Sequence, residues 1–199
     1  MSYSSFTLAQ LIKYFGLSFH ESAGLLGNVA EAESSDLLKS VLSENVALAV
    51  AIGTEKARSE MIITPILLEL RRHFAKQISL FSGIDFTVAP EKGLSGVCDY
   101  LVSQSAEQLL VRAPVIMLVE AKNENLKGGL PQCIAEMVAA QQFNQQQENP
   151  VDAVYGVVTS GTVWRFLRLR GSVVEIDLDE YYTQNIGQVL GILCSAITG

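Results

Sequence analysis

A carboxylate and an ammonium group close the most apolar segment of the chain. The run from Ala113 to Val119 contains no charged or hydrogen-bonding side chain, and Glu120-Ala121-Lys122 follows it directly. Because side chains alternate between the two faces of a strand, Glu120 and Lys122 point the same way. Opposite charges at the end of a buried strand are costly unless they are paired or bind a ligand. We therefore expect a sheet with a buried strand here and a functional site where that strand ends.

A second strand is predicted before this one, across a polar connection. Residues 96–103 have the composition of a strand, and the polar stretch 104–108 reads as a turn. The point halfway between Asp99 and Glu120 falls inside this connection, so a regular antiparallel hairpin sets the two carboxylates roughly opposite, with Cβ atoms about 4.5–5.5 Å apart. A divalent cation such as Mg²⁺ or Mn²⁺ would relieve their repulsion. The alternative is a solvated Asp99 beside a surface ion pair of Glu120 and Lys122.

In the order strand, turn, strand, Asp99 and Glu120-Ala121-Lys122 resemble the motif of the PD-(D/E)XK nuclease superfamily. Three flanking segments are similar to the nuclease domain of type I restriction subunits: a helix before the hairpin that contains Glu60, a helix after it that contains Gln132, and a late hairpin at 155–166. The resemblance covers about residues 54–169. It departs from the family at Cys98, where the motif has proline.

The resemblance implies an α/β fold with a restriction-endonuclease-like core, in which helices flank a central mixed β-sheet. Residues 54–199 would form this domain. Residues 1–53 would be an N-terminal helical extension packed on the core, within one compact domain overall.

It also implies a metal-dependent nuclease or nuclease subunit that hydrolyses phosphodiester bonds in nucleic acid, with DNA as the expected substrate. Asp99, Glu120 and the backbone carbonyl of Ala121 would hold Mg²⁺ or Mn²⁺, with Glu60 as a further ligand. Lys122 would orient or deprotonate the attacking water. Gln132 would be a neighbour of the site; the alternative for Gln132 is a polar helix face in solvent.

The charge of the chain argues against tight, unaided binding of DNA. Its 14 Lys and Arg residues against 21 Asp and Glu give a net charge of −7, whereas autonomous DNA-binding domains usually present a basic face. A nuclease of this kind would bind weakly, depend on a partner protein for targeting, or act as a homodimer. The alternative function is a non-catalytic interaction or assembly module that retains the nuclease fold.

Other features set the expected cellular context. No apolar run reaches the length of a membrane span, and the N-terminus lacks the pattern of a secretory signal. Three widely separated cysteines suit reduced thiols better than a disulfide framework. We expect a cytoplasmic protein without a membrane partner.

The apolar periodicity predicts the remaining elements. Helices are expected at 6–15, 35–52, 55–76 with a bend or restart at Pro65, 130–147 and 181–197. Further strands are expected at 84–88, 154–159, 163–170 and, as a sheet edge, 173–178.

Other polar residues are weaker candidates for the site. Asp85 lies on a predicted strand and competes with Asp99 as the metal acid, but it lacks the hairpin register. His20 and His73 have no partner nearby in sequence.

Overall fold

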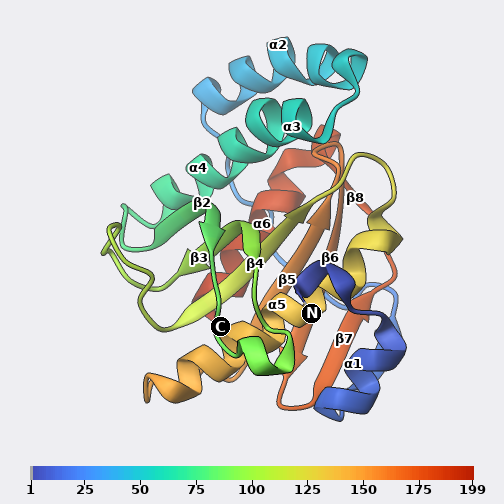
Figure 1. The fold of residues 1–199 in the computed structure, drawn as a ribbon. Helices are drawn as coiled ribbons and strands as arrows, with labels where there is room; N and C mark the ends of the chain where they lie inside the picture. The colour runs from blue at the N-terminus through green and yellow to red at the C-terminus, as the bar shows by residue number, and fades with distance from the viewer. Residues whose placement is uncertain (1) are drawn as a thin grey trace.

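The structure is a computed structural model that describes residues 2–199. A mixed eight-stranded sheet crosses the molecule with helices on both faces (Figure 1). The strand order is β1-β7-β6-β5-β4-β3-β2, with β8 paired to β6. The pairs β4–β5 and β1–β7 are parallel and the others are antiparallel. The strands are β1 (Ser18–Ser22), β2 (Ser79–Asp85), β3 (Val97–Ser103), β4 (Val115–Ala121), β5 (Val154–Thr159), β6 (Val163–Arg170), β7 (Val173–Asp177) and β8 (Tyr181–Tyr182).

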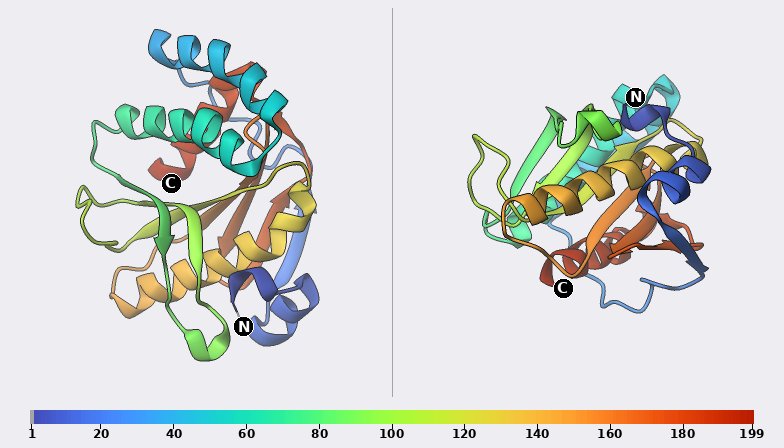
Figure 2. Two further views of the ribbon diagram at one scale, coloured as in Figure 1. Left: turned by 45° about the horizontal axis from the view of Figure 1, so that its top comes forward. Right: turned by 60° about the horizontal axis from the view of Figure 1, so that its bottom comes forward.

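The helices divide between the two faces of the sheet, as the views in Figure 2 show. One face carries α5, with α1 beside it, and the other carries α2, α3, α4 and α6. A π-helical turn at Ser59–Ile63 joins α3 directly to α4. The helices are α1 (Leu8–Phe15), α2 (Asp36–Ile52), α3 (Glu55–Arg58), α4 (Thr64–His73), α5 (Leu126–Gln146) and α6 (Ile186–Thr198). The expected α/β architecture with a central mixed sheet flanked by helices is therefore present.

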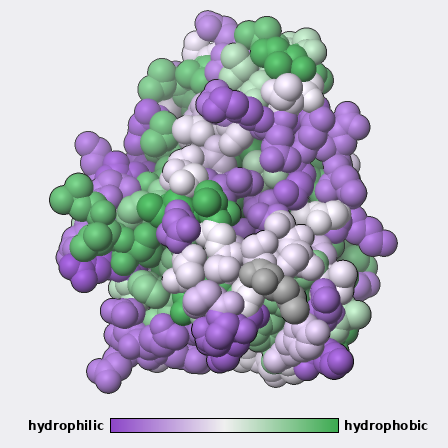
Figure 3. Space-filling model, in the orientation of Figure 1, coloured by the Kyte–Doolittle hydropathy of each residue, from purple (hydrophilic) through white to green (hydrophobic). Residues whose placement is uncertain are grey.

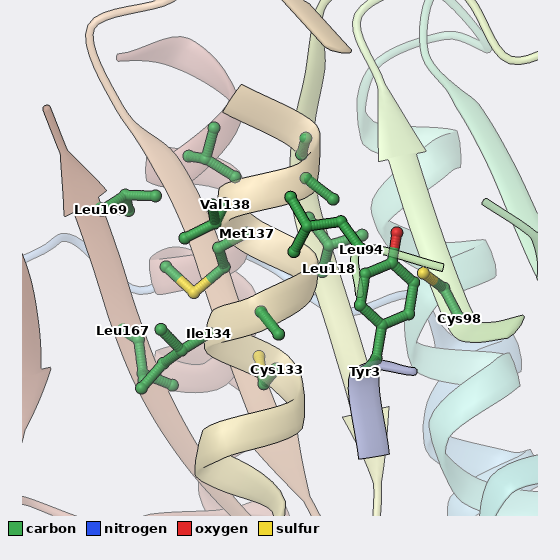
Figure 4. Packing of buried hydrophobic residues seen from close by; sticks show 14 of the residues in the cluster. Tyr3, Leu94, Cys98, Leu118, Cys133, Ile134, Met137, Val138, Leu167 and Leu169 are labelled. Atoms are coloured by element: carbon green, nitrogen blue, oxygen red, sulfur yellow. The ribbon is translucent and has the colours of Figure 1, made fainter. Parts of the chain in front are cut away.

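The two middle strands are enclosed on both sides. Every residue of β4 and of β5 is buried, as is usual where helices cover both faces of parallel strands. On the α5 face, Cys133 and Met137 lie among side chains of the sheet, and Tyr3 packs beside Leu94 and Cys98 (Figure 4). Because β4 is wholly enclosed, the charged residue near its end is enclosed as well.

Two helix predictions are confirmed, although α1 begins two residues later than expected. The Thr7 side chain accepts a hydrogen bond at the start of α1, which ends at Gly16 in the left-handed conformation. Ser35 caps α2 in the same way, and Gly53 ends it with φ of 71°. Short polar side chains at helix starts and glycine at helix ends explain why these boundaries can be read from sequence.

The prediction for the sheet edge is wrong. Ser18–Ser22, which includes His20, forms β1 and pairs in parallel with β7. Residues 1–53 therefore contribute a strand as well as helices, and β7 is an internal strand. This segment, Ser-Phe-His-Glu-Ser, lacks the apolar alternation that identifies a half-buried strand.

Three further boundaries differ from the prediction. The first predicted strand lies earlier, at Ser79–Asp85, where Gly83 has φ of 62° and interrupts the strand pattern. Helix α5 begins at Leu126, because the Asn125 side chain caps it despite the glycines that follow. Helix α6 begins at Ile186, since Tyr181–Tyr182 pair with β6.

None of the helices within residues 2–199 combines the length and the hydrophobicity that a membrane crossing requires.

Helix α5 is fastened to the start of β4 by one buried amide. The Asn144 side chain is 1% exposed, accepts a hydrogen bond from the Val115 backbone N–H at 2.7 Å and donates one to the Val115 carbonyl at 2.8 Å. Asn144→Ala should lower the free energy of unfolding by about 2–4 kcal/mol, because buried backbone groups lose their partner. Urea unfolding measures this change. The control is Gln145→Ala, at the exposed neighbouring position; equal unfolding midpoints for the two variants would contradict the prediction.

Candidate functional site

The hairpin of β3 and β4 sets two carboxylates opposite one another. Tyr100 pairs with Val119 and Leu101 with Leu118, and the same register continued by one residue places Asp99 opposite Glu120. This is the register predicted from the sequence. The register shifts only beyond Val102, away from the site.

Asp99 is half-buried and bound to the end of β4. Its Oδ2 accepts a hydrogen bond from the backbone N–H of Ala121 at 2.8 Å. Burial raises the pKa of Asp99, and the hydrogen bond from Ala121 and the charge of Lys122 oppose this rise. The carboxylate therefore sits at the strand end in a fixed position and not as a freely solvated acid.

Glu120 is buried, with an exposed fraction of 1%. Its Oε1 contacts the ammonium group of Lys122, and its Oε2 has no hydrogen-bond partner among the described residues. Burial, followed by the charge of Asp99, raises the pKa of Glu120 to about 8. The pair with Lys122 is thus not a surface ion pair, and the free oxygen of Glu120 requires a proton or a cation.

A cleft of about 290 Å³ opens beside Asp99. Asp99 and Ala121 line it from the hairpin, and Glu55 and Glu60 line it from the start of the long helical segment. Glu60 is exposed and forms an ion pair with Lys56 at 2.7 Å. The structure therefore places Glu60 at the same cleft as Asp99, but with its charge already paired.

The π-helical turn shapes the wall of this cleft. The hydroxyl group of Tyr100 hydrogen-bonds with those of Ser59 and Thr64, the latter at 2.8 Å, which fastens the turn to β3. Turns of this type occur frequently at functional sites.

Glu55 is a site residue that the sequence analysis missed. Besides lining the cleft, its charge contributes to raising the pKa values of Glu120 and Lys122. Its position directly after the capping residue Thr54 made it resemble an ordinary helix-start acid. Its proximity to Asp99 and Glu120 becomes apparent only from the way α3 packs in the folded structure.

Gln132 lies on α5 and donates a hydrogen bond from Nε2 to Oε1 of Glu136 at 3.2 Å. The two side chains therefore share one face of α5. Glu136 is fully buried and its Oε2 has no partner within residues 2–199. Burial, followed by the charge of Glu120, raises its pKa well above the usual value. In the sequence, Glu136 interrupts the otherwise apolar residues 134–138, and this is the signal that could have identified a second buried carboxyl.

The other candidate residues lie apart from this cleft. Asp85 is exposed at the end of β2, paired with Val97, and does not line the cleft. His73 ends α4 beside a different depression, and His20 lies in β1.

The donors of the site suit a hard divalent cation. Asp99 and Glu120 carry carboxylate oxygens, and the unpartnered Oε2 of Glu120 gives a buried position that a cation would satisfy. Across the described part of the chain, no three His, Cys, Asp or Glu side chains form a ready-made metal cluster. This arrangement fits Mg²⁺ or Mn²⁺ held by one or two carboxylates together with water, a common mode for Mg²⁺.

No family model matches the chain, and no curated protein matches it significantly.

The raised pKa of Glu120 predicts how stability depends on pH without metal. The folded protein holds a proton on this carboxyl up to about pH 8, whereas the unfolded chain releases it near pH 4.3. The stabilising contribution is therefore complete below about pH 4 and is lost as the pH rises through about 8.

We expect the free energy of unfolding to fall between about pH 5 and pH 8, by at most about 1.4 kcal/mol per pH unit for this group. Glu120→Gln should flatten this slope, since the amide does not titrate. Urea unfolding in chelator-treated buffer measures it, with Glu124→Gln, at an exposed position, as the control. Equal slopes in the two variants would show that Glu120 titrates normally.

Proposed function

We propose that this protein is a metal-dependent nuclease or nuclease subunit that hydrolyses phosphodiester bonds in nucleic acid, with DNA as the substrate. The observation that carries the proposal is the carboxylate of Glu120. It is buried at the end of β4, faces Asp99 across the hairpin, contacts Lys122 and keeps one oxygen without a partner among residues 2–199. A metal ion and a phosphate would use all of these groups.

The order of the core elements supports the same proposal. Strands β2, β3 and β4 are consecutive and antiparallel, α5 follows, and β5 returns parallel to β4. The PD-(D/E)XK resemblance implies this order of strand, strand, strand, helix, strand. Asp99 and Glu120 lie on the hairpin of β3 and β4, and Lys122 directly follows β4. These are the positions that the resemblance implies for the motif residues.

In this proposal Asp99, Glu120 and the Ala121 carbonyl hold Mg²⁺ or Mn²⁺. Such an ion polarises the scissile phosphate and lowers the pKa of bound water. Glu60 lines the same cleft, but its ion pair with Lys56 must open before it can serve. Glu55 lines the cleft and forms no ion pair among the described residues, and we propose it as the helix acid that joins the metal site.

Lys122 orients or deprotonates the attacking water and stabilises the charge that develops on the phosphate oxygens. Its contact with Glu120 and its packing along α5 fix its position. A Cβ atom added at Gly129 would lie 3.0 Å from Cγ of Lys122, so this glycine leaves space for the lysine stem. Gln132 donates a hydrogen bond to Glu136, a carboxyl whose pKa is raised by the charge of Glu120.

The acidic net charge of −7 limits how the enzyme would reach DNA. A chain with this charge gains little from general attraction to phosphates. We therefore propose weak binding that a targeting protein or a second copy of the chain assists. A cytoplasmic location belongs to the same proposal.

One observation favours the alternative function, a non-catalytic interaction module. Apolar side chains are exposed on α2, where Leu37 and Leu48 are about half exposed, and in the β3–β4 connection, where Leu109 is 96% exposed. Figure 3 shows apolar surface over both places, at the top and at the left of the molecule. Such surfaces suit a protein partner. In this alternative, partner binding would not depend on Lys122.

Lys122→Ala separates the two functions. In the nuclease, cleavage of plasmid or single-stranded DNA with Mg²⁺ or Mn²⁺ should fall by about 10²–10⁴-fold, because the group that handles the proton is lost. The melting temperature should change little. The control is Lys39→Ala, which removes an exposed lysine of α2 that does not line the cleft and should cleave as the wild type does.

Cleavage that survives in Lys122→Ala would show that the catalytic assignment is wrong. Absence of cleavage in the wild type under all these conditions would favour the interaction module.

A further inference from the structure

Arg58, the last residue of α3, is a buried cation held by neutral groups. It is 7% exposed. Its Nε donates to Oδ1 of Asn123 at 3.1 Å, and its Nη1 donates to the carbonyl of Ser160 at 3.1 Å and to Oγ1 of Thr162 at 3.5 Å. These bonds fix the plane of the guanidinium group against two loops at the end of the sheet.

The charge of Arg58 is not compensated. It forms no ion pair with any acid within residues 2–199. Its Nη2 has no hydrogen-bond partner in this range. The buried side-chain atoms without a partner are all on other residues, so Nη2 is not buried. The Nη2 edge therefore reaches solvent. A nearly buried cation without a counter-ion is costly, and a fixed guanidinium edge is well suited to bind a phosphate.

The position of Arg58 connects it to the candidate site. Its partner Asn123 directly follows Lys122, and Glu55, one turn earlier on α3, lines the cleft beside Asp99. Its partner Ser160 lines a second cleft of about 440 Å³, whose wall also contains Lys127. Arg58 therefore lies between residues that line the two clefts and contacts the loop that follows Lys122.

The turn that supplies the acceptors is packed tightly against the same helix. Gly161 has φ of 83°, and a Cβ atom added there would lie 3.2 Å from Cβ of Ile62. Glycine thus allows the turn to approach the helix and keeps the Ser160 carbonyl in place. The guanidinium group is held before any ligand binds, which reduces the entropy that binding would cost.

We propose that Arg58 binds a backbone phosphate of the nucleic acid next to the phosphate that reacts, and so positions the strand across the two clefts. This inference rests on the proposed nuclease function and adds a residue that contacts the substrate. Both clefts also carry acids, and two of their cations are already paired, Lys56 with Glu60 and Arg165 with Glu180. Arg58 has no acid partner within residues 2–199 and is therefore available to a phosphate.

The test is the binding of a short fluorescein-labelled DNA duplex, followed by anisotropy at several salt concentrations without divalent metal. Arg58→Gln should weaken binding about tenfold and reduce the slope of log K against log salt concentration by about one, because one phosphate contact is lost. The control is Arg112→Gln, which removes an arginine paired with Glu107 in the β3–β4 connection. It should leave both quantities unchanged.

The outcomes distinguish this inference from the proposed function. Unchanged affinity and slope in Arg58→Gln would overturn the role of Arg58, while cleavage by the wild type would still support the nuclease. Absence of DNA binding by the wild type would overturn the role of Arg58 and leave the nuclease function to be decided by the cleavage assay.

A second measurement uses the wild-type protein, in case Arg58→Gln does not fold. The side-chain NMR signal of Arg58 should shift on addition of the dinucleotide pTpT. An unchanged Arg58 signal, while other signals shift, would overturn the proposal.

Discussion

The burial of the Glu120 carboxylate is the constraint on which the rest of the site depends. β4 is covered by α5 on one face and by α6 and its neighbours on the other, so every residue of the strand is buried, including this acid. Lys122 satisfies one carboxylate oxygen, and the other has no partner among the described residues. A second acid, Asp99, lies across the hairpin. The fold thus stabilises a site that is complete only with a proton or a cation.

The scaffold holds this site through helix α5. Asn144 fastens one end of the helix to the start of β4, and Gly156 lets the helix lie close on β5, because a Cβ atom there would lie 2.4 Å from the sulfur of Met137. At the other end, Gly129 leaves space for Lys122. Arg58 joins α3 to the loops that follow β4 and β5. The acids and the lysine are therefore fixed by contacts outside the site itself.

The sequence was sufficient for the features that depend on local pattern. The hairpin register of Asp99 and Glu120 follows from alternation and loop position, and the ends of α2 follow from Ser35 and Gly53. The sequence was insufficient for features whose position depends on packing between segments that are far apart along the chain. β1 is polar and pairs with a strand far along the chain, and the proximity of Glu55 and Arg58 to the strand end depends on how α3 docks. No local pattern encodes those contacts.

The most direct test of the account is calorimetric titration of the metal-free protein with Mn²⁺ at constant ionic strength. The wild type should bind the ion, while Asp99→Asn and Glu120→Gln should each lose binding, because each removes a carboxylate from the hairpin. Glu124→Gln, on the exposed segment after β4, should bind as the wild type does. Binding that persists in Glu120→Gln, or no binding by the wild type, would contradict a cation site between these two strands.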